Sequence, residues 1–366
     1  MDHQASIFRA LYLYLRGFLD FFRRCRPSYP GNIFSSNIGD AILAVFSGLT
    51  PDARQLYDFE RYKRRDFLTD FELRVKSALI SEGLGDLLDD RVVFYDYMSP
   101  YLRMPRHFGY IRQGKVYPGY LSGAAPECPV EVFNFFKGLL GREVTVVIKP
   151  SRPGQREKFF WLTWTPGAQF SLDGLPATEQ QVRKKVEKLG AYLISEPVDQ
   201  ADYAKDIFPY AINSIKILTM IDPQTNEPFA PGACHCFGTT ASSPTDSLER
   251  GACWTGVDIK NGLTTKGFAI LDGELVEIKK HPDTKKQLQS VPIPFLTETV
   301  FELLKQHRRI NYLKLINWNV VMQNDGFILL SADSAPDLRA FQVVQPLVLD
   351  SRVFKFFNHY HVINRG

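Results

Sequence analysis

Residues 315–337, LINWNVVMQNDGFILLSADSAPD, constrain the fold of this chain more than any other stretch. Two largely apolar runs, residues 316–322 and 327–331, flank Asn324-Asp325-Gly326, whose residue types tolerate positive φ. This pattern predicts two β-strands joined by a tight turn. The hairpin also carries three polar residues, Asn319, Ser331 and Asp333. Oxygen ligands on two adjacent strands suit a hard cation such as Mg²⁺, so the sequence predicts a metal-binding hairpin.

Composition narrows the class of protein. At 366 residues the chain is long enough for two or three domains, and a hydrophobic fraction of 45% is typical of a packed globular protein. Forty-four Lys and Arg against 40 Asp and Glu give a net charge of only +4, which argues against a dedicated nucleic-acid-binding protein. No apolar run is long enough to span a bilayer, so we expect no transmembrane segment and a cytoplasmic protein.

The N-terminal part, residues 1–85, is expected to be mainly helical. Residues 7–26, IFRALYLYLRGFLDFFRRCR, combine wide apolar coverage with a recurring Arg-rich polar face. We favour an amphipathic helix packed on the body of the protein. The alternative is peripheral contact with an anionic membrane surface, in which case deletion of residues 1–26 would abolish co-sedimentation with liposomes. Residues 36–74 also have a mainly helical pattern, with Thr50-Pro51-Asp52 as a start signal.

Several strands and one helix follow from the apolar patterns of the central part. Residues 143–150, EVTVVIKP, predict a buried strand that ends at Lys149, whose ammonium suits phosphate oxygens. We expect further strands at residues 159–164, 192–198 and 211–220. Residues 180–189 predict a basic helix.

The five cysteines are irregularly spaced, which argues against a disulfide framework. Cys234, His235, Cys236 and Cys253 could suggest zinc. However, alternation along a strand directs His235 away from the two neighbouring thiols, and paired Cys-x-x-Cys spacing is absent from the sequence. We therefore do not predict a zinc site.

Taken together, these motifs resemble the ATP-grasp superfamily, and in particular its sugar-transfer-associated branch, over residues 85–350. Residues 211–220, AINSIKILTM, are similar to the branch's Asn-Thr-Ile-Arg-Val-Val-Thr strand, with Ser214 and Lys216 replacing Thr and Arg. In the hairpin, the family's acid, Glu and Asn fall on Asn319, Ser331 and Asp333. The other matching stretches are Asp246…Gly251, Gly256-Val257-Asp258, residues 281–284 and residues 293–294, and an arginine of the branch falls on Cys236.

The resemblance implies an α+β ATP-grasp fold, with two α+β lobes and the nucleotide between them, preceded by the N-terminal helical region. The expected domains are residues 1–85, an N-terminal lobe with its lid at residues 86–200, and a C-terminal lobe with the metal hairpin at residues 201–366. It also implies ATP and Mg²⁺ as cofactors.

The resemblance assigns roles to individual residues as well. Lys149, Arg91 and Gly154 of the lid fall on positions that contact the nucleotide phosphates, and Glu196 falls on the carboxylate that meets the ribose. Arg91 could instead be an ordinary surface arginine at a helix start, and Glu196 an exposed edge-strand residue. Catalytic positions fall on Lys149, Asn213 and Lys216. The metal ligands fall on Asn319, Ser331 and Asp333.

The implied reaction is ATP-dependent joining of a carboxylate to an amine through an acyl phosphate, in natural-product or glycoconjugate biosynthesis. Its partners would be a small-molecule acid and a small-molecule amine. The hairpin has one carboxylate where the family has two, to which Asp337 or Asp325 could add another. A phosphotransferase on the same fold, or a nucleotide-binding pseudoenzyme, are therefore the alternatives.

Overall fold

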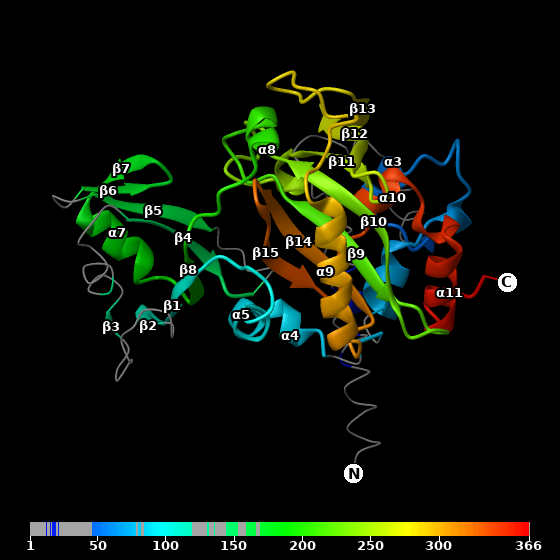
Figure 1. Ribbon diagram of the computed structural model, residues 1–366, viewed down its shortest axis with the longest axis horizontal. Helices are drawn as coiled ribbons and strands as arrows, with labels where there is room; N and C mark the ends of the chain where they lie inside the picture. Colours follow the sequence, from blue (N-terminus) through cyan, green and yellow to red (C-terminus); the bar gives the residue numbers. More distant parts are fainter. Residues whose placement is uncertain are drawn as a thin grey trace, which may run out of the picture. The chain divides into compact units, whose positions relative to one another are not determined.

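The computed structural model describes residues 46–77, 80–81, 84–118, 130–131, 144–152, 159–165 and 169–365, together with residues 12, 15, 17–19, 21 and 135. The chain divides into two compact units. Unit 1 comprises Met1–Asp86, Gln200–Phe327 and Ser331–Gly366, and unit 2 comprises Leu87–Asp199 and Ile328–Leu330. Each unit is built on a sheet with antiparallel strand pairs and flanking helices, which confirms the predicted α+β class (Figure 1).

Among the described residues, unit 1 has a seven-stranded sheet in the order β13-β12-β11-β10-β9-β14-β15. The strands are β9 (Ile215–Ile221), β10 (Pro228–Phe237), β11 (Cys253–Asp258), β12 (Leu263–Leu271), β13 (Glu274–Ile278), β14 (Leu315–Gln323) and β15 (Gly326–Asp333). Strands β14 and β15 form the predicted hairpin, and both are longer than the apolar runs suggested. The strand predicted at residues 211–220 begins only at Ile215.

The helical elements of unit 1 are short apart from one. They are α3 (Pro51–Leu56), α8 (Asp202–Ile207), α9 (Leu296–Arg309), α10 (Arg339–Val344) and α11 (Ser351–His359), the 3₁₀ helices η1 (Arg64–Asp66), η5 (Leu248–Arg250) and η6 (Leu347–Leu349), and the π-helical turn η2 (Glu72–Lys76).

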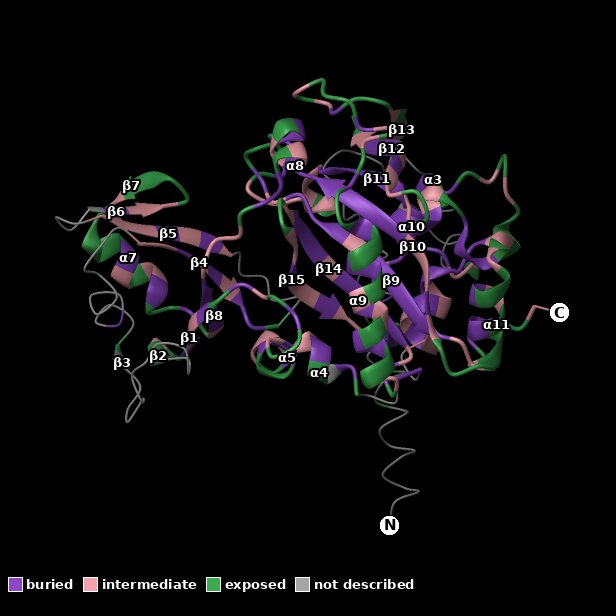
Figure 2. Ribbon diagram, viewed as in Figure 1, coloured by how far each residue is buried: buried purple, intermediate pink, exposed green. Residues whose placement is uncertain are grey.

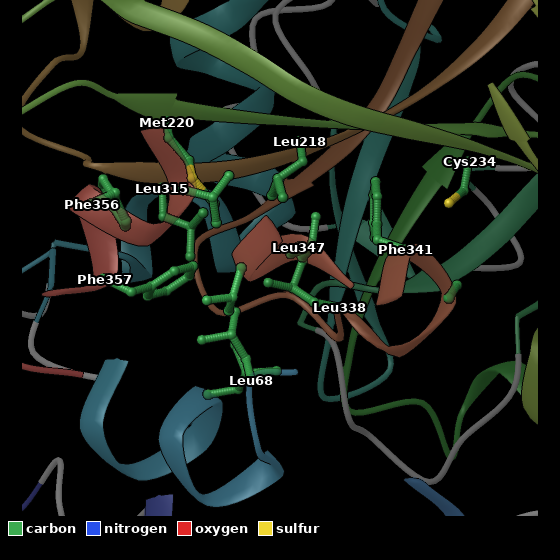
Figure 3. Packing of buried hydrophobic residues seen from close by; sticks show 14 of the residues in the cluster. Leu68, Leu218, Met220, Cys234, Leu315, Leu338, Phe341, Leu347, Phe356 and Phe357 are labelled. Carbon is green, nitrogen blue, oxygen red and sulfur yellow. The ribbon is translucent and has the colours of Figure 1, made fainter. Parts of the chain in front are cut away.

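The two faces of this sheet are covered by different segments. On one face, the sheet residues Leu218, Met220 and Leu315 pack against the C-terminal helical segments and the N-terminal segment (Figure 3). The side chains that meet them there are Leu68, Leu338, Phe341, Leu347, Phe356 and Phe357. We call this side the Lys216 face, since Lys216 and Leu218 alternate with residues on the other side. Burial of both faces leaves the central strands almost fully covered (Figure 2).

Helix α9 lies across the opposite face and is fastened there by a buried polar contact. His307 Nδ1 lies 2.7 Å from Thr219 Oγ1, and Trp318 Nε1 donates to the same oxygen over 2.8 Å. His307 Nε2 lies 2.7 Å from the carbonyl of Leu313. Burial lowers the pKa of His307 to about 4, so the ring is neutral and its polar atoms are satisfied.

The segment before unit 2 is less helical than its charge pattern predicted. Thr50 caps α3 as expected, but the helix ends at Leu56 and the chain turns back. The Asp70 carboxylate accepts hydrogen bonds from Thr50 N and Oγ1 at 2.8 and 2.9 Å, and the ring of Tyr57 stacks on that of Phe67 at 4.5 Å. These contacts fold residues 50–70 on themselves, so the prediction of a mainly helical stretch was wrong here. Residues 36–45 lie outside the described residues.

Most of the predicted helix at residues 7–26 lies outside the described residues, but those described are helical. Phe21 is buried and meets Phe71 edge-on at 5.7 Å. A Cβ on Gly17 would lie 2.3 Å from the carbonyl oxygen of Arg74, so this glycine allows a close backbone approach. These contacts favour the packed interpretation, while Leu15 and Leu19 remain exposed. Membrane contact stays a prediction.

No helix within the described residues is long and apolar enough to cross a membrane.

Among the described residues, unit 2 has an eight-stranded sheet in the order β3-β2-β1-β8-β4-β5-β6-β7. Its strands are β1 (His107–Arg112), β2 (Lys115–Pro118), β3 (Val130–Glu131), β4 (Val144–Pro150), β5 (Phe160–Thr165), β6 (Gln169–Leu172), β7 (Leu175–Ala177) and β8 (Ala191–Ser195). The helices are α5 (Arg91–Met98) and α7 (Glu179–Val186), with α4 (Asp86–Asp89) preceding them. The predicted strands at residues 143–150, 159–164 and 192–198 and the basic helix at 180–189 are confirmed, with shifted ends.

Candidate functional site

In unit 2 the structure brings two predicted site residues, Lys149 and Arg91, to one place. Lys149 is the second-last residue of β4, and Arg91 is the first residue of α5. The backbone N–H of Arg91 donates to Ser151 O over 2.8 Å, and its Nη1 donates to Pro150 O over 2.5 Å. Asp90 caps α5 by accepting from Val92 N at 3.0 Å. The start of the helix is thereby tied to the end of the strand.

The electrostatics of this place favour an anion. Burial and the nearby guanidinium of Arg91 lower the pKa of Lys149 to about 7. Burial, with Lys149 beside it, also lowers the pKa of His107 to about 2, and this neutral ring stacks on Tyr95 at 3.7 Å. Within the described residues, the Lys149 ammonium has no hydrogen-bond or ion-pair partner. A bound phosphate would supply the missing negative charge.

The lid that follows β4 is described only at its ends. Arg152 Nε lies 3.2 Å from Asp90 Oδ2, which adds a third cation to this part of unit 2. The predicted phosphate contact of Gly154 lies outside the described residues, as does the rest of residues 153–158.

Glu196 follows β8 directly. Because β8 lies between β1 and β4, the edge-strand interpretation of Glu196 is wrong. Its N–H donates to Arg106 O over 2.9 Å, and its Oε1 accepts from Arg106 N at 2.8 Å. The carboxylate is therefore held in one orientation through its first oxygen.

In unit 1 the predicted residues Lys216 and Asn319 are brought directly opposite each other in the β9–β14 pair. Cys234 of β10 lies opposite Lys216 on its other side. Directly opposed residues of an antiparallel pair project to the same face of the sheet. A polar row thus crosses the otherwise apolar Lys216 face.

Negative groups surround the ammonium of Lys216. Its pKa is raised above the ordinary value by the Cys236 sulfur and by the carboxyl groups of Asp246, Asp337 and Asp333, against the opposing effect of burial. Burial raises the pKa of Cys236 to about 12, so at neutral pH this side chain is an uncharged thiol and the carboxylates supply the negative charge. Lys216 is therefore an ammonium at neutral pH.

Asp246, which the matched motif includes, is fixed by Ser214 at the entrance to β9. Its Oδ2 accepts from Ser214 N at 2.8 Å and from Ser214 Oγ. Burial raises the pKa of Asp246, while these hydrogen bonds and Lys216 favour its charged form. The sequence indicated the loop but not this pairing.

The donor set of the hairpin fits a hard cation. Asn319 Oδ1 is buried and accepts no hydrogen bond from any described residue, and neither does Asn317 Oδ1 two positions earlier. Buried acceptors without partners are rare, which marks Asn319 as a ligand candidate. Ser331 and Asp333 lie on β15, the partner strand of the hairpin. An amide oxygen, a hydroxyl and a carboxylate are the ligand types that Mg²⁺ takes, with few protein oxygens and several positions left for phosphate or water.

Asp337 does not add a ligand to this set, contrary to the suggestion from the sequence. Its carboxylate accepts from Arg339 Nε at 2.9 and 3.0 Å, and Arg74 Nη2 lies 3.7 Å from its Oδ2. Two guanidinium groups therefore already use its charge. Asp325 lies in the turn of the hairpin, between β14 and β15.

Asn213, predicted to be catalytic, is fully engaged within the fold. Its Nδ2 donates to Ala204 O and Phe208 O at 3.0 and 2.8 Å, and its Oδ1 accepts from Gly238 N at 3.0 Å. The amide thus binds the end of α8 to the strand that follows. A catalytic contact of Asn213 stays a prediction, and this geometry favours a structural role.

His235 and the cysteines do not converge on a metal. Cys234 shares the Lys216 face, whereas His235 lies on the other face, with its Nε2 2.9 Å from Tyr203 Oη and its ring stacked on Phe237. Within the described part of the chain, no group of three or more His, Cys, Asp or Glu side chains could hold a metal ion.

Comparison with solved structures finds ATP-grasp enzymes at low sequence identity. The ADP complex of N5-carboxyaminoimidazole ribonucleotide synthetase is 7% identical, covers 69% of this chain and has a TM-score of 0.36. The D-alanine–D-alanine ligase from Coxiella burnetii is 9% identical over 79% of this chain, with a TM-score of 0.36, and that from Bacillus anthracis is 8% identical over 78%, with a TM-score of 0.37. The matches span 46%, 60% and 76% of the length of those three structures. A search of curated proteins found no match.

The family comparison is more extensive. A family model described as sugar-transfer associated ATP-grasp matches residues 82–357, which include every residue discussed in this section except Arg74. The expected ATP-grasp fold is thereby confirmed, and the chain belongs to the sugar-transfer-associated ATP-grasp family.

Proposed function

We propose that this protein is an ATP-dependent ligase that joins a carboxylate to an amine through an acyl phosphate. Family membership supports the use of ATP. The observation that carries the proposal is the pair Lys149 and Arg91, two neighbouring cations held by hydrogen bonds of α5 to the end of β4. Such a pair costs stability unless an anion binds it, which is typical of a site built for phosphate.

In this proposal the residues of unit 2 bind the nucleotide. Lys149 and Arg91 contact phosphate oxygens, Lys149 as a point charge and Arg91 through its planar fork. The Glu196 carboxylate, oriented by Arg106 N, accepts from a ribose hydroxyl through its second oxygen.

The residues of unit 1 bind the metal and the acid. Asn319, Ser331 and Asp333 would hold Mg²⁺, which supplies charge neutralisation at the transferring phosphoryl group. Lys216 binds the substrate carboxylate or the acyl phosphate as an ammonium. No side-chain nucleophile takes part, since the work of the protein is positioning and charge stabilisation.

The first experiment uses hydroxylamine as a general amine. The protein is incubated with ATP, Mg²⁺ and a panel of carboxylic acids, and ADP and hydroxamate are measured together. We expect one class of acid to give both products, and the Lys149→Met variant to give neither. With an ¹⁸O-labelled acid, one labelled oxygen should appear in the released phosphate, because the carboxylate oxygen attacks phosphorus and leaves with it.

One observation favours a second candidate, a nucleotide-binding protein without turnover. Asn319 and Ser331 are uncharged, so Asp333 is the single carboxylate among the three predicted ligands. ATP-dependent thermal stabilisation with no ADP release over the whole panel would support this candidate and contradict the ligase. ADP release that depends on a hydroxyl compound, without hydroxamate, would instead indicate a phosphotransferase.

A further inference from the structure

Lys216 is surrounded by carboxylates yet is ion-paired with none of them within the described residues. Asp246, Asp333 and Asp337 all lie close enough to raise its pKa, with the Cys236 sulfur the largest influence. An ammonium in an ion pair would be a poor ligand for a substrate anion, since the pair would have to break first. The question is what keeps these carboxylates from Lys216.

Each of two carboxylates is held by another donor. Asp246 is bound by the N–H and hydroxyl of Ser214, as described above. Asp337 accepts two hydrogen bonds from Arg339 Nε, and Arg339 is 5% exposed at its side chain. Arg74 is the second cation on Asp337, with 13% of its side chain exposed. Its charge therefore acts in a poorly hydrated setting, where it is weakly screened.

Arg74 comes from outside the region that defines the family. It belongs to η2 (Glu72–Lys76), before the family match begins at residue 82. Single π-helical turns often mark places where a side chain is re-aimed for a functional reason.

The segment that carries Arg74 is anchored on the helical C-terminal part of unit 1. Gln342 of α10 accepts from Leu68 N at 2.7 Å and donates to Leu68 O at 3.0 Å and to Tyr57 Oη at 2.8 Å. Arg365 Nη2 donates to both oxygens of the neighbouring Glu72 at 2.8 and 2.6 Å. These buried and half-buried contacts fix η2 relative to Asp337, so the position of Arg74 is set by the fold.

We infer that Arg74 is a positioning residue of the site: together with Arg339 it holds the Asp337 carboxylate and so leaves the Lys216 ammonium available to an anionic ligand. The N-terminal segment is thereby part of the functional unit, although the family match does not include it. The inference rests on the proposed function for the identity of the anion, but not for the contest between Arg74 and Lys216 over Asp337.

The test compares Arg74→Ala with the double variant Arg74→Ala/Asp337→Asn. In the single variant, Asp337 loses one of its two cations and pairs with Lys216, so the affinity for Mg²⁺-ATP should fall about tenfold. In the double variant the competing charge is gone, and the affinity should return to near the wild-type value. A role in stability alone predicts the opposite order, because the second substitution removes further contacts. Arg74→Lys should retain most of the affinity, and Arg65→Ala, an exposed arginine of the same segment, is the matched control.

A second measurement does not require nucleotide. Acetylation of Lys216 by a sulfonated N-hydroxysuccinimide ester, followed by mass spectrometry, reports whether its amine is free. Acetylation should be slower in Arg74→Ala than in wild type and restored in the double variant. Equal rates in all three proteins would overturn the inference even if ATP binds. If the wild type does not bind ATP but the acetylation pattern holds, the proposed function fails and the role of Arg74 stands.

Discussion

Asn319 lies directly opposite Lys216 in the β9–β14 pair, so an uncharged amide faces an ammonium on one side of the sheet. A carboxylate at the first position would satisfy the lysine but would also bind it. The amide leaves its buried Oδ1 without a described hydrogen-bond donor and leaves the ammonium without an ion pair. This arrangement keeps both groups available to ligands, at some cost in stability.

The Asn319→Asp variant should need less Mg²⁺. An added carboxylate increases the charge of the ligand set, and we expect the Mg²⁺ concentration for half-maximal ATP-induced stabilisation to fall roughly tenfold. Asn319→Leu, which removes the oxygen, should lose the Mg²⁺ dependence while the folded protein remains stable. Thermal shift over a Mg²⁺ series measures both. An unchanged Mg²⁺ requirement in both variants would mean that Asn319 is not a ligand.

Lys149→Met should stabilise the free protein while removing its response to ATP. Because the pKa of Lys149 is lowered from 10.5 to about 7, the folded state binds fewer protons than the unfolded state between those values. The cost of burying the ammonium is thus largest below pH 7 and fades as the pH rises towards 10.5. At pH 6 the variant should melt roughly 2–4 °C above wild type, for about 1 kcal/mol recovered, and the difference should shrink at pH 9.

The same pKa predicts a pH dependence of ATP binding. In wild type, affinity should decline as the pH rises through 7, because the free protein loses the Lys149 charge. Lys149→Arg, which stays charged, should flatten this decline. Titration calorimetry from pH 6 to pH 9 gives both curves, and parallel curves for the two proteins would contradict the assignment.

Asn213→Ala should act on stability rather than on binding. The substitution removes three hydrogen bonds of a buried amide and leaves two carbonyls and one N–H without partners, at a cost of about 2–4 kcal/mol. Denaturant unfolding would show this loss, while ATP affinity of the folded variant should stay near wild type. Loss of ATP affinity at unchanged stability would instead support the catalytic role that the family motif implies.

Gln342→Glu should loosen the N-terminal segment. The new carboxylate keeps the acceptor for Leu68 N but faces the Leu68 carbonyl with a second acceptor in a buried place, so we expect a loss of about 3 kcal/mol. Limited proteolysis should then cut first within residues 46–77. Gln345→Glu is the control, because Gln345 is exposed. Equal cleavage patterns in the two variants would contradict the anchoring role of Gln342.

Local patterns predicted the parts of the site that single strands provide. Asn324-Asp325-Gly326 identified the hairpin because a tight turn demands residues that adopt positive φ, and Gly326 has φ of 142°. The β-branched run before Lys149 identified β4 because burial on a sheet favours those residues. Helix capping at Thr50 and Asp90 was likewise visible, since a cap is a contact within three residues.

Contacts between distant positions were not predictable. Nothing in the local sequence shows that Arg74 meets Asp337, or that His107 lies near Lys149. The charges of residues 52–71 suggested a helix, but Asp70 uses its carboxylate on Thr50 and so stabilises a turn-rich segment. The role of Asn213 was assigned by motif alone, and its three hydrogen bonds appear only once α8 is in place.

The division of the chain has a consequence for the order in which the protein can mature during synthesis. Unit 2 is nearly continuous, so it can fold once Asp199 has left the ribosome, whereas unit 1 is assembled from separate stretches. The partners of Leu68, on Gln342, and of Glu72, on Arg365, are translated last. At ~5–20 residues per second, the segment that carries Arg74 waits on the order of tens of seconds with its apolar side chains uncovered. Until then it is a natural client for chaperones, and the site of unit 1 is complete only after translation ends.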